Sequence, residues 1–238
     1  MDETAASATV GPGWVVSPFD VPADATVEVS VRALANGDDD LIGIAFSYQS
    51  ASQHVLMHWK QNTQVFNWGD TTVVNDDVAE VGIKVLRING SFTRDGLWGG
   101  TDGAGVSTLA GPVGTGWVDN TTYRFRFALT PGRVVISRDG TQILDVSSPA
   151  ITGGRIALFS FSQDDVIFSD VVATGCDDID FNNNDVFPEE QDVIDFFNVL
   201  AGADCPACND IDFNNNGVFP EEQDVIDFFN VLAGGDCP

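Results

Sequence analysis

The sequence has few basic residues and no long hydrophobic run. Its 238 residues include 36 acidic side chains but only 10 Lys and Arg, so the formal net charge is −26. Nucleic acids and anionic lipid surfaces are bound through clusters of Lys and Arg, so we expect neither as a partner. No run of about 18 apolar residues occurs, which argues against membrane insertion. Cations are the natural ligands of such an acidic chain.

Cysteine is absent from the first 175 residues. All four cysteines, Cys176, Cys205, Cys208 and Cys237, lie in the last 63 residues, with spacings of 29, 3 and 29. The central Cys-Pro-Ala-Cys allows a zinc or redox interpretation, but this region has no histidine and no βαβ pattern. We therefore predict two disulfides that each bracket one repeat, joining Cys176 to Cys205 and Cys208 to Cys237. Such bonds indicate an oxidising compartment, so we expect a secreted or cell-surface protein.

The C-terminal segment is an internal duplication. Residues 176–205 align without a gap on residues 208–237 and differ from them at only three positions. Apolar residues at helical spacing predict one amphipathic helix in each repeat. Proline is expected in the first turn of each helix and glycine at its end. The residues that define these predicted helices are Pro188, Val193, Phe196, Phe197, Leu200 and Gly202, with their equivalents Pro220, Val225, Phe228, Phe229, Leu232 and Gly234.

The first 175 residues show short runs of β-favouring residues separated by Gly, Asn, Asp and Pro. This pattern predicts a mainly β domain, a jelly-roll or concanavalin-like sandwich, without a helix. We expect the domain to span residues 1–175, and the repeats to span 176–206 and 207–238. The clearest predicted strands are Thr26–Ala33, Leu41–Tyr48, His54–Trp59, Gly82–Ile88, Tyr123–Leu129, Val134–Arg138, Arg155–Ser162 and Val166–Ala173.

Each repeat contains an Asp/Asn-rich loop with the spacing of a calcium site. Ca²⁺ prefers six to eight oxygen ligands, and alternate Asp and Asn side chains in a short loop converge on one point. The preferred register starts at Asp180 or Asp212 and ends one residue later than the usual twelfth position. Gly217 then occupies the sharp turn at position 6, where the first repeat has Asp185. The predicted ligands are Asp180, Asn182, Asn184, the Val186 carbonyl and Asp192, and likewise Asp212, Asn214, Asn216, the Val218 carbonyl and Asp224.

A second register is also compatible with the loops. It starts at Asp178 or Asp210 and closes with Glu189 or Glu221 at position 12. Either register gives one ion per repeat. The alternative to both is an Asx-rich turn without metal, in which two uncompensated acidic loops would repel each other.

The unit DFNNNGVFPEEQDVIDFFNVL resembles the dockerin-type calcium repeats of secreted bacterial proteins, most closely their FP-containing variants in planctomycete-like proteins. The resemblance implies EF-hand-like calcium binding. The extra residue before Asp192 and Asp224, Asp185 in place of glycine and the flanking cysteines depart from that pattern. These departures bear on binding to the cohesin partners of the family rather than on calcium.

Residues 38–172 resemble the C-terminal lectin-like jelly roll of thrombospondins. The similarity is carried by DDDLIGIAFSYQSASQHVLMHWKQ, GWVDNTTYRFRF and GGRIALFSFSQDDVIFSDV. It implies an extracellular, calcium-associated sandwich used in matrix contacts and assembly. The acidic motif of Asp38, Asp39 and Asp40 then implies a further calcium site, with Asp164 or Asp165 nearby. The alternative for this motif is a solvated charge run before a buried strand.

Catalytic residues are scarce. Only His54 and His58 occur, four residues apart on one predicted strand, and no nucleophile or third metal ligand accompanies them. We therefore expect cross-strand or surface histidines and no enzymatic activity. The five tryptophans, Trp14, Trp59, Trp68, Trp98 and Trp117, could stack on sugars but fit a core role better.

Two hypotheses of function follow. The first is an extracellular calcium-binding adhesion protein, whose repeats mediate self-assembly, including into a filament of identical copies, or dock on a cell-surface or matrix partner. The second is a lectin-like module that binds glycan and is attached to a larger assembly by its repeats. The near-identical acidic repeats favour the first hypothesis, because repeated surfaces suit repeated contacts.

Overall fold

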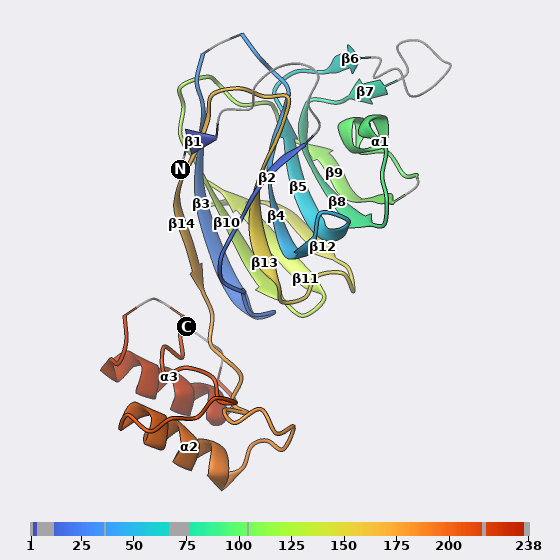
Figure 1. The fold of residues 1–238 in the computed structure, drawn as a ribbon. Helices are drawn as coiled ribbons and strands as arrows, with labels where there is room; N and C mark the ends of the chain where they lie inside the picture. Colours follow the sequence, from blue (N-terminus) through green and yellow to red (C-terminus); the bar gives the residue numbers. More distant parts are fainter. Residues whose placement is uncertain are drawn as a thin grey trace.

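The computed structural model describes residues 2–3, 12–35, 37–66, 77–103, 105–215 and 218–235. Within them, two antiparallel sheets of six strands each form a sandwich, and two helices follow it at the C-terminal end (Figure 1). The predicted mainly β sandwich is therefore confirmed. The predictions for Trp68, Asn216, Gly217 and Cys237 lie outside the described residues. No helix in the described part is long and apolar enough to cross a membrane.

Most strands lie where the alternating sequence pattern predicts them, with boundaries within two residues. In spatial order the first sheet consists of β1 (Asp2–Glu3), β14 (Val166–Thr174), β3 (Ala25–Ala33), β10 (Tyr123–Thr130), β11 (Arg133–Arg138) and β12 (Thr141–Ser147). The second consists of β2 (Gly13–Val16), β13 (Arg155–Phe161), β4 (Leu41–Ser50), β5 (Gln53–Lys60), β8 (Gly82–Asn89) and β9 (Val106–Val113). A separate two-stranded ribbon joins β6 (Gln64–Phe66) to β7 (Asp77–Ala79).

The main core lies between the two sheets. Alternate residues of β3 and β10 are buried in it, including Val27, Val29 and Phe125, as expected for strands with one inward face. Trp59 and Trp117 also belong to this core and meet edge to face with ring centroids 5.5 Å apart. These two tryptophans therefore stabilise the sandwich and are not available to stack on a sugar.

A second apolar cluster covers the opposite face of the second sheet. It includes Phe159 and Phe161 of β13 and, from a short helix, Leu97 and Trp98. This helix, α1 (Arg94–Gly99), contradicts the expectation of a sandwich without a helix. Its sequence hides it, because glycines lie within it and at its end. Burial of Leu97 and Trp98 and the Thr93 side chain, which accepts the Gly96 N–H, hold it in place.

The two histidines lie under this cover and not at the surface. His54 and His58 of β5 are each only 3% exposed, on the same face of the sheet. Burial lowers the pKa of His54 to about 4. Burial, together with the charge of Lys84, lowers the pKa of His58 to about 3. Both side chains are therefore neutral at physiological pH.

The repeats form one small helical unit below the sandwich (Figure 1). Its helices are α2 (Glu190–Leu200) and α3 (Glu222–Leu232), with one in each repeat as the periodicity predicts. Pro188 and Pro220 precede these helices and do not lie in their first turns. The cause is a capping box in which the Glu189 side chain accepts the Asp192 N–H and the Asp192 side chain accepts the Glu189 N–H. Glu221 and Asp224 form the same box in α3.

Four fully buried phenylalanines join the two repeats in a single core. Phe196 of α2 stacks on Phe228 of α3 with ring centroids 4.2 Å apart and an interplanar angle of 6°. Phe181 and Phe213, from the two loops, close this stack edge to face at 5.3 Å and 5.2 Å. Neither repeat can bury its phenylalanines alone, so the pair behaves as one folding unit.

Candidate metal centre

The first candidate loop is organised around the carboxylate of Asp180, which is 5% exposed. Its Oδ1 accepts the backbone N–H of Asn184 at 3.0 Å, and its Oδ2 accepts that of Asp185 at 2.7 Å. Asp185 has a φ of 63°, in the left-handed region that favours glycine. The backbone thus turns sharply at the position where the second repeat has Gly217.

The closing carboxylate of this loop has an unsatisfied oxygen. Asp192 is fully buried, and its Oδ2 accepts the Glu189 N–H at 3.1 Å. Its Oδ1 is also buried and has no hydrogen-bond partner. An unpaired buried polar atom costs about 1–3 kcal/mol, and more when it is charged. A hard cation such as Ca²⁺, which takes carboxylate ligands, would remove this cost.

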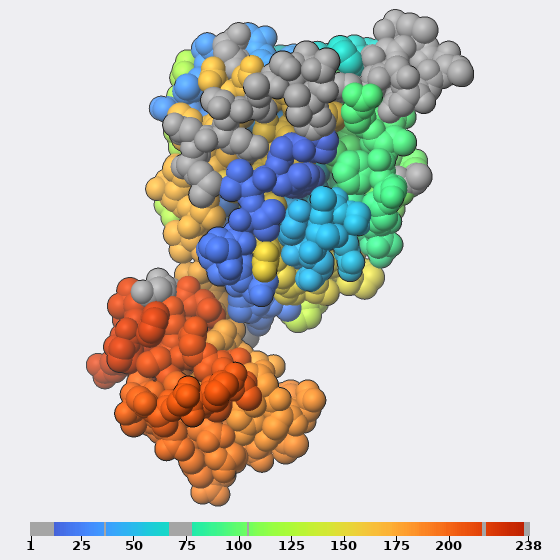
Figure 2. Space-filling model, in the orientation of Figure 1, coloured from blue at the N-terminus to red at the C-terminus, as the bar shows by residue number. Residues whose placement is uncertain are grey.

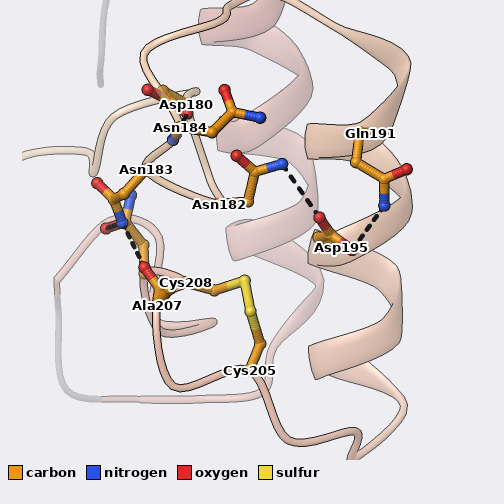
Figure 3. The surroundings of a disulfide bond; sticks show 10 residues. Asp180, Asn182, Asn183, Asn184, Gln191, Asp195, Cys205, Ala207 and Cys208 are labelled. Carbon is orange, nitrogen blue, oxygen red and sulfur yellow. Dashed lines mark hydrogen bonds between the residues drawn. A yellow bond between two sulfur atoms is a disulfide. The ribbon is translucent and has the colours of Figure 1, made fainter.

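The amide of Asn182 is oriented by a residue that sequence reasoning missed. Its Nδ2 donates to Oδ2 of Asp195 at 3.1 Å (Figure 3), which directs its Oδ1 away from that carboxylate. This Oδ1 is buried without a hydrogen-bond partner. Gln191 donates to the other oxygen of Asp195 at 2.8 Å and holds it in place. Asp195 is therefore a positioning residue that leaves the Asn182 oxygen free to bind a cation.

The second loop repeats this arrangement. Asn214 donates to Oδ2 of Asp227 at 2.9 Å, as Asn182 does to Asp195. Asp224 is fully buried, its Oδ2 accepts the Glu221 N–H at 3.1 Å, and its Oδ1 has no hydrogen-bond partner. Burial raises the pKa of Asp224, although the backbone N–H groups of Glu221 and Asn214 lower it. The signal for Asp195 and Asp227 in the sequence is their presence at the same position in both repeats.

The ligands of the alternative register have other roles in the structure. Oδ1 of Asp178 accepts the Asp180 N–H at 3.1 Å, and Oδ1 of Asp210 accepts the Asp212 N–H at 2.9 Å. Both aspartates thus shape the turn that precedes the loop. Glu189, like Glu221 in the second repeat, is the N-cap of its helix.

The remaining predicted ligands are less buried. Asn184 is exposed; its Oδ1 accepts the Val186 N–H at 2.7 Å, and its Nδ2 donates to Glu189 at 2.6 Å. The side chains of Val186 and Val218 are 56% and 59% exposed. Among the described residues, no three His, Cys, Asp or Glu gather as a metal cluster. The ligand sets predicted from the sequence combine aspartate with asparagine oxygens.

The disulfide predictions are wrong in their pairing. Cys205 bonds to Cys208 (Figure 3), with Cα atoms 5.3 Å apart, so neither closes its own repeat. The cause is a tight turn in which the Cys208 N–H donates to the Cys205 carbonyl at 3.1 Å. Cys176 is also disulfide-bonded. The sequence spacing suggested that each disulfide closes one repeat. In the structure the chain reverses between the two repeats, and this reversal brings Cys205 and Cys208 together.

The acidic motif of the sandwich contacts a buried lysine. The ammonium of Lys60, whose side chain is fully buried, lies 3.2 Å from Asp39 and 3.6 Å from Asp40. It also lies 4.8 Å from the Trp98 ring centroid, in a cation–π contact. Burial raises the pKa of Asp40 to about 6, although Lys60 lowers it. Lys60 thus already supplies positive charge to both carboxylates, and the calcium site expected there stays a prediction.

Comparison with known proteins identifies the family of the sandwich. Residues 20–178 match the family described as "Thrombospondin C-terminal region". The chain belongs to the thrombospondin C-terminal family. Related chains include thrombospondin-2 of Bos taurus, 36% identical over 146 residues, and thrombospondin-3a of Danio rerio, 30% identical over 167 residues. The alignments cover 56% and 64% of this chain but only 12% and 16% of those relatives.

The solved structures that superpose on this chain include a carbohydrate-binding module and an agglutinin. The carbohydrate-binding module CBM66 from Bacillus subtilis superposes with a TM-score of 0.49 and 13% identity, covering 73% of this chain and 91% of the module. CG-16, a homodimeric agglutinin from chicken liver, gives a TM-score of 0.41 and 10% identity, covering 68% of this chain and 98% of the agglutinin.

Proposed function

We propose that this thrombospondin C-terminal family member is a secreted, non-enzymatic calcium-binding protein. In this proposal each repeat loop binds one Ca²⁺, and the loaded repeats attach the sandwich to a partner protein. The ligands are the side chains of Asp180, Asn182, Asn184 and Asp192 in the first loop and those of Asp212, Asn214, Asn216 and Asp224 in the second, with the carbonyls of Val186 and Val218. The observation that carries the proposal is the buried, unpaired Oδ1 of Asp192 and of Asp224.

Charge supports this assignment. The segment 176–238 contains 16 of the 36 acidic residues and none of the 10 basic ones. Such a density of like charge destabilises a compact unit by self-repulsion unless cations compensate it. Ca²⁺ bound through aspartate and asparagine oxygens would supply that compensation where two acidic loops flank one apolar core.

Calorimetric titration of the oxidised full chain with calcium tests the sites. We expect each of the variants Asp192→Asn and Asp224→Asn to bind one calcium ion fewer than the wild type. The variant Asp204→Asn is the matched control, because it removes the same charge from an exposed residue outside the loops. Calcium binding that is absent, or that neither loop variant reduces, would contradict the proposal.

The repeats also display apolar side chains suited to a protein contact. Phe197 and Phe229, on the two helices, are 43% and 41% exposed, and their ring centroids lie 5.9 Å apart. Each repeat adds three more exposed apolar residues, which are Val186, Phe187 and Ile194 in the first and Val218, Phe219 and Ile226 in the second. Exposed apolar side chains at this density mark interaction surfaces.

The negative charge of the molecule indicates which kind of partner would bind these exposed apolar side chains of the repeats. The repeats are entirely acidic in their charged residues, and the sandwich is also net negative. A partner with an apolar centre and a rim of Lys and Arg would complement that surface, whereas a second copy would add like charge. We therefore assign the set to a different protein and not to self-assembly into a filament.

A peptide of defined composition can distinguish a basic partner protein from a second copy of the chain. We expect an amphipathic Leu/Lys peptide to bind the calcium-loaded chain more tightly than a Ser/Lys peptide of equal charge. The double variant Phe197→Ala/Phe229→Ala should remove that difference. Light scattering in calcium should show a monomer; growth into polymers would instead assign the set to copies of the same chain.

A further inference from the structure

Each loop is hydrogen-bonded to the start of the other repeat, and for the second loop this segment is also where the chain leaves the sandwich. In the second loop, Nδ2 of Asn215 donates to the Gly175 carbonyl and to Oδ1 of Asp177, each at 2.9 Å. Two backbone hydrogen bonds strengthen this contact. The Gly175 N–H donates to the Asn214 carbonyl at 3.3 Å, and the Asp177 N–H donates to the Phe213 carbonyl at 2.8 Å. Gly175 immediately follows β14, so the second loop is hydrogen-bonded to the chain at the point where it leaves the sandwich.

The first loop makes the equivalent contacts within the repeats. Nδ2 of Asn183 donates to the Ala207 carbonyl at 2.8 Å and to Oδ1 of Asn209 at 3.1 Å. The Asn209 N–H donates to the Phe181 carbonyl at 2.9 Å. Ala207 lies inside the turn closed by the Cys205–Cys208 disulfide (Figure 3). The first loop therefore fastens one repeat to the other and does not reach the sandwich through these bonds.

Gly175 contacts both the sandwich and the second repeat loop. A Cβ added at Gly175 would lie 2.7 Å from the Asp24 carbonyl oxygen and 2.7 Å from the Ala25 Cβ, at the start of β3. No larger residue fits this approach without a shift of the backbone. The second loop thus reaches the sandwich through a glycine that is packed against β3 on one side and hydrogen-bonded by the loop on the other.

An open pocket lies at the junction between the sandwich and the repeats. A pocket of about 370 Å³ separates the sandwich from the second loop, lined by Phe19 and Val172 on one side and by Asp212 and Asn215 on the other. The space-filling view shows the repeats joined to the sandwich over a narrow neck (Figure 2). The hydrogen bonds of the second loop to Gly175 and Asp177 thus lie at the junction between the two parts.

We infer that the second loop is a calcium-dependent clamp that sets the orientation of the sandwich relative to the repeats, with Asn215 as its positioning residue. The inference rests on the proposed calcium binding, and it assigns distinct roles to the two ions. The ion in the first loop stabilises the repeat pair. The ion in the second loop orders residues 212–215 and, through Gly175, fixes the interdomain geometry.

Matched variants in the oxidised full chain test the clamp. Asn215→Ala and Asn183→Ala remove the same side-chain amide from equivalent positions outside the ligand set. In saturating calcium we expect Asn215→Ala to speed exchange of the Asp177 amide by about tenfold and to broaden the interdomain distances seen by small-angle X-ray scattering. Asn183→Ala should speed exchange at Asn209 instead and leave the scattering unchanged. Gly175→Ala is a second variant that should change the scattering, because it shifts the backbone that Asn214 and Asn215 contact.

The outcomes separate the clamp from calcium binding itself. Calorimetry on the same samples should count as many calcium ions in Asn215→Ala as in the wild type. If both repeat loops bind calcium but chelation leaves the scattering unchanged, or both asparagine variants change it equally, the clamp is wrong and the proposed function stands. If no calcium binds, both are wrong.

Discussion

The sandwich and the repeats are stabilised in different ways, although they belong to one chain. The sandwich buries a large core between two six-stranded sheets, and a second apolar cluster covers one outer face. The repeats bury essentially one stack of four phenylalanines and carry only acidic charged side chains. Small units rarely bury enough apolar surface to be stable alone. Disulfides and, in our proposal, calcium make up that deficit in the repeats.

Removal of calcium should produce the largest difference in stability between the sandwich and the repeats. At a free calcium concentration 100 times the dissociation constant, each ion contributes about 2.7 kcal/mol, so two ions contribute about 5 kcal/mol. We expect excess EDTA to remove hydrogen-exchange protection from α2 and α3 while the strands of the sandwich stay protected. Equal loss in both regions would show that the sandwich depends on the same ions.

Truncation of the phenylalanine stack should have the next largest effect. Phe228 is fully buried against Phe196, so Phe228→Ala should cost about 3–5 kcal/mol in the unfolding free energy of the repeats. The neighbouring Phe229 is 41% exposed, and Phe229→Ala should cost less than about 1 kcal/mol. Hydrogen exchange in calcium measures both. Similar losses from the two variants would mean that the stack is not the core of this unit.

Acid should weaken the sandwich through its histidines. Burial lowers the pKa of His54 to about 4 and that of His58 to about 3. Between these values and the ordinary pKa of about 6.5, the unfolded chain binds more protons than the folded one, so stability falls as pH falls. We expect His58 alone to contribute a loss of about 2–3 kcal/mol between pH 7 and 4.5, measured by urea unfolding.

The variant His58→Leu separates the contribution of His58 to this pH dependence from the opposite contribution of Asp40. The raised pKa of Asp40, about 6, favours its protonated form in the folded chain, so its contribution to stability falls as pH rises through the same interval. Lys84, the charged group that acts on His58 in the folded chain, is retained in the variant His58→Leu. The variant should lose less stability than the wild type on acidification. An identical pH dependence would show that His58 takes up its proton in the folded state.

The smallest effect is expected at the turn of the first loop. Asp185 adopts a φ of 63°, and its N–H but not its side chain holds the Asp180 carboxylate. Asp185→Gly should therefore relieve backbone strain and stabilise the repeats by up to about 1 kcal/mol. Asp185→Ala is the control, since it removes the same charge without glycine's freedom. Stabilisation by alanine as well would assign the gain to charge and not to backbone.

Prediction from sequence worked where the signal is local. Alternation along β3 and the helical spacing in the repeats place apolar residues on one face, which defines both elements without knowledge of their neighbours. The loop spacing of Asp180, Asn182 and Asp192 likewise singled out side chains with buried or unpaired oxygens. Glu189 was harder to assign, because the same glutamate can close a calcium loop or cap a helix, and only the start of α2 distinguishes them.

The sequence by itself determined the order of the parts, namely a β-rich region without cysteine followed by two acidic repeats with calcium-type loops, because each pattern follows from residues near one another in the chain. Tertiary structure alone decided the burial of His54 and His58, the pairing of Cys205 with Cys208, and the different targets of Asn183 and Asn215. Those features depend on which segments meet in space. Near-identical loops have different targets here because the second repeat is preceded by the turn at Cys205–Cys208 and the first repeat by the end of β14.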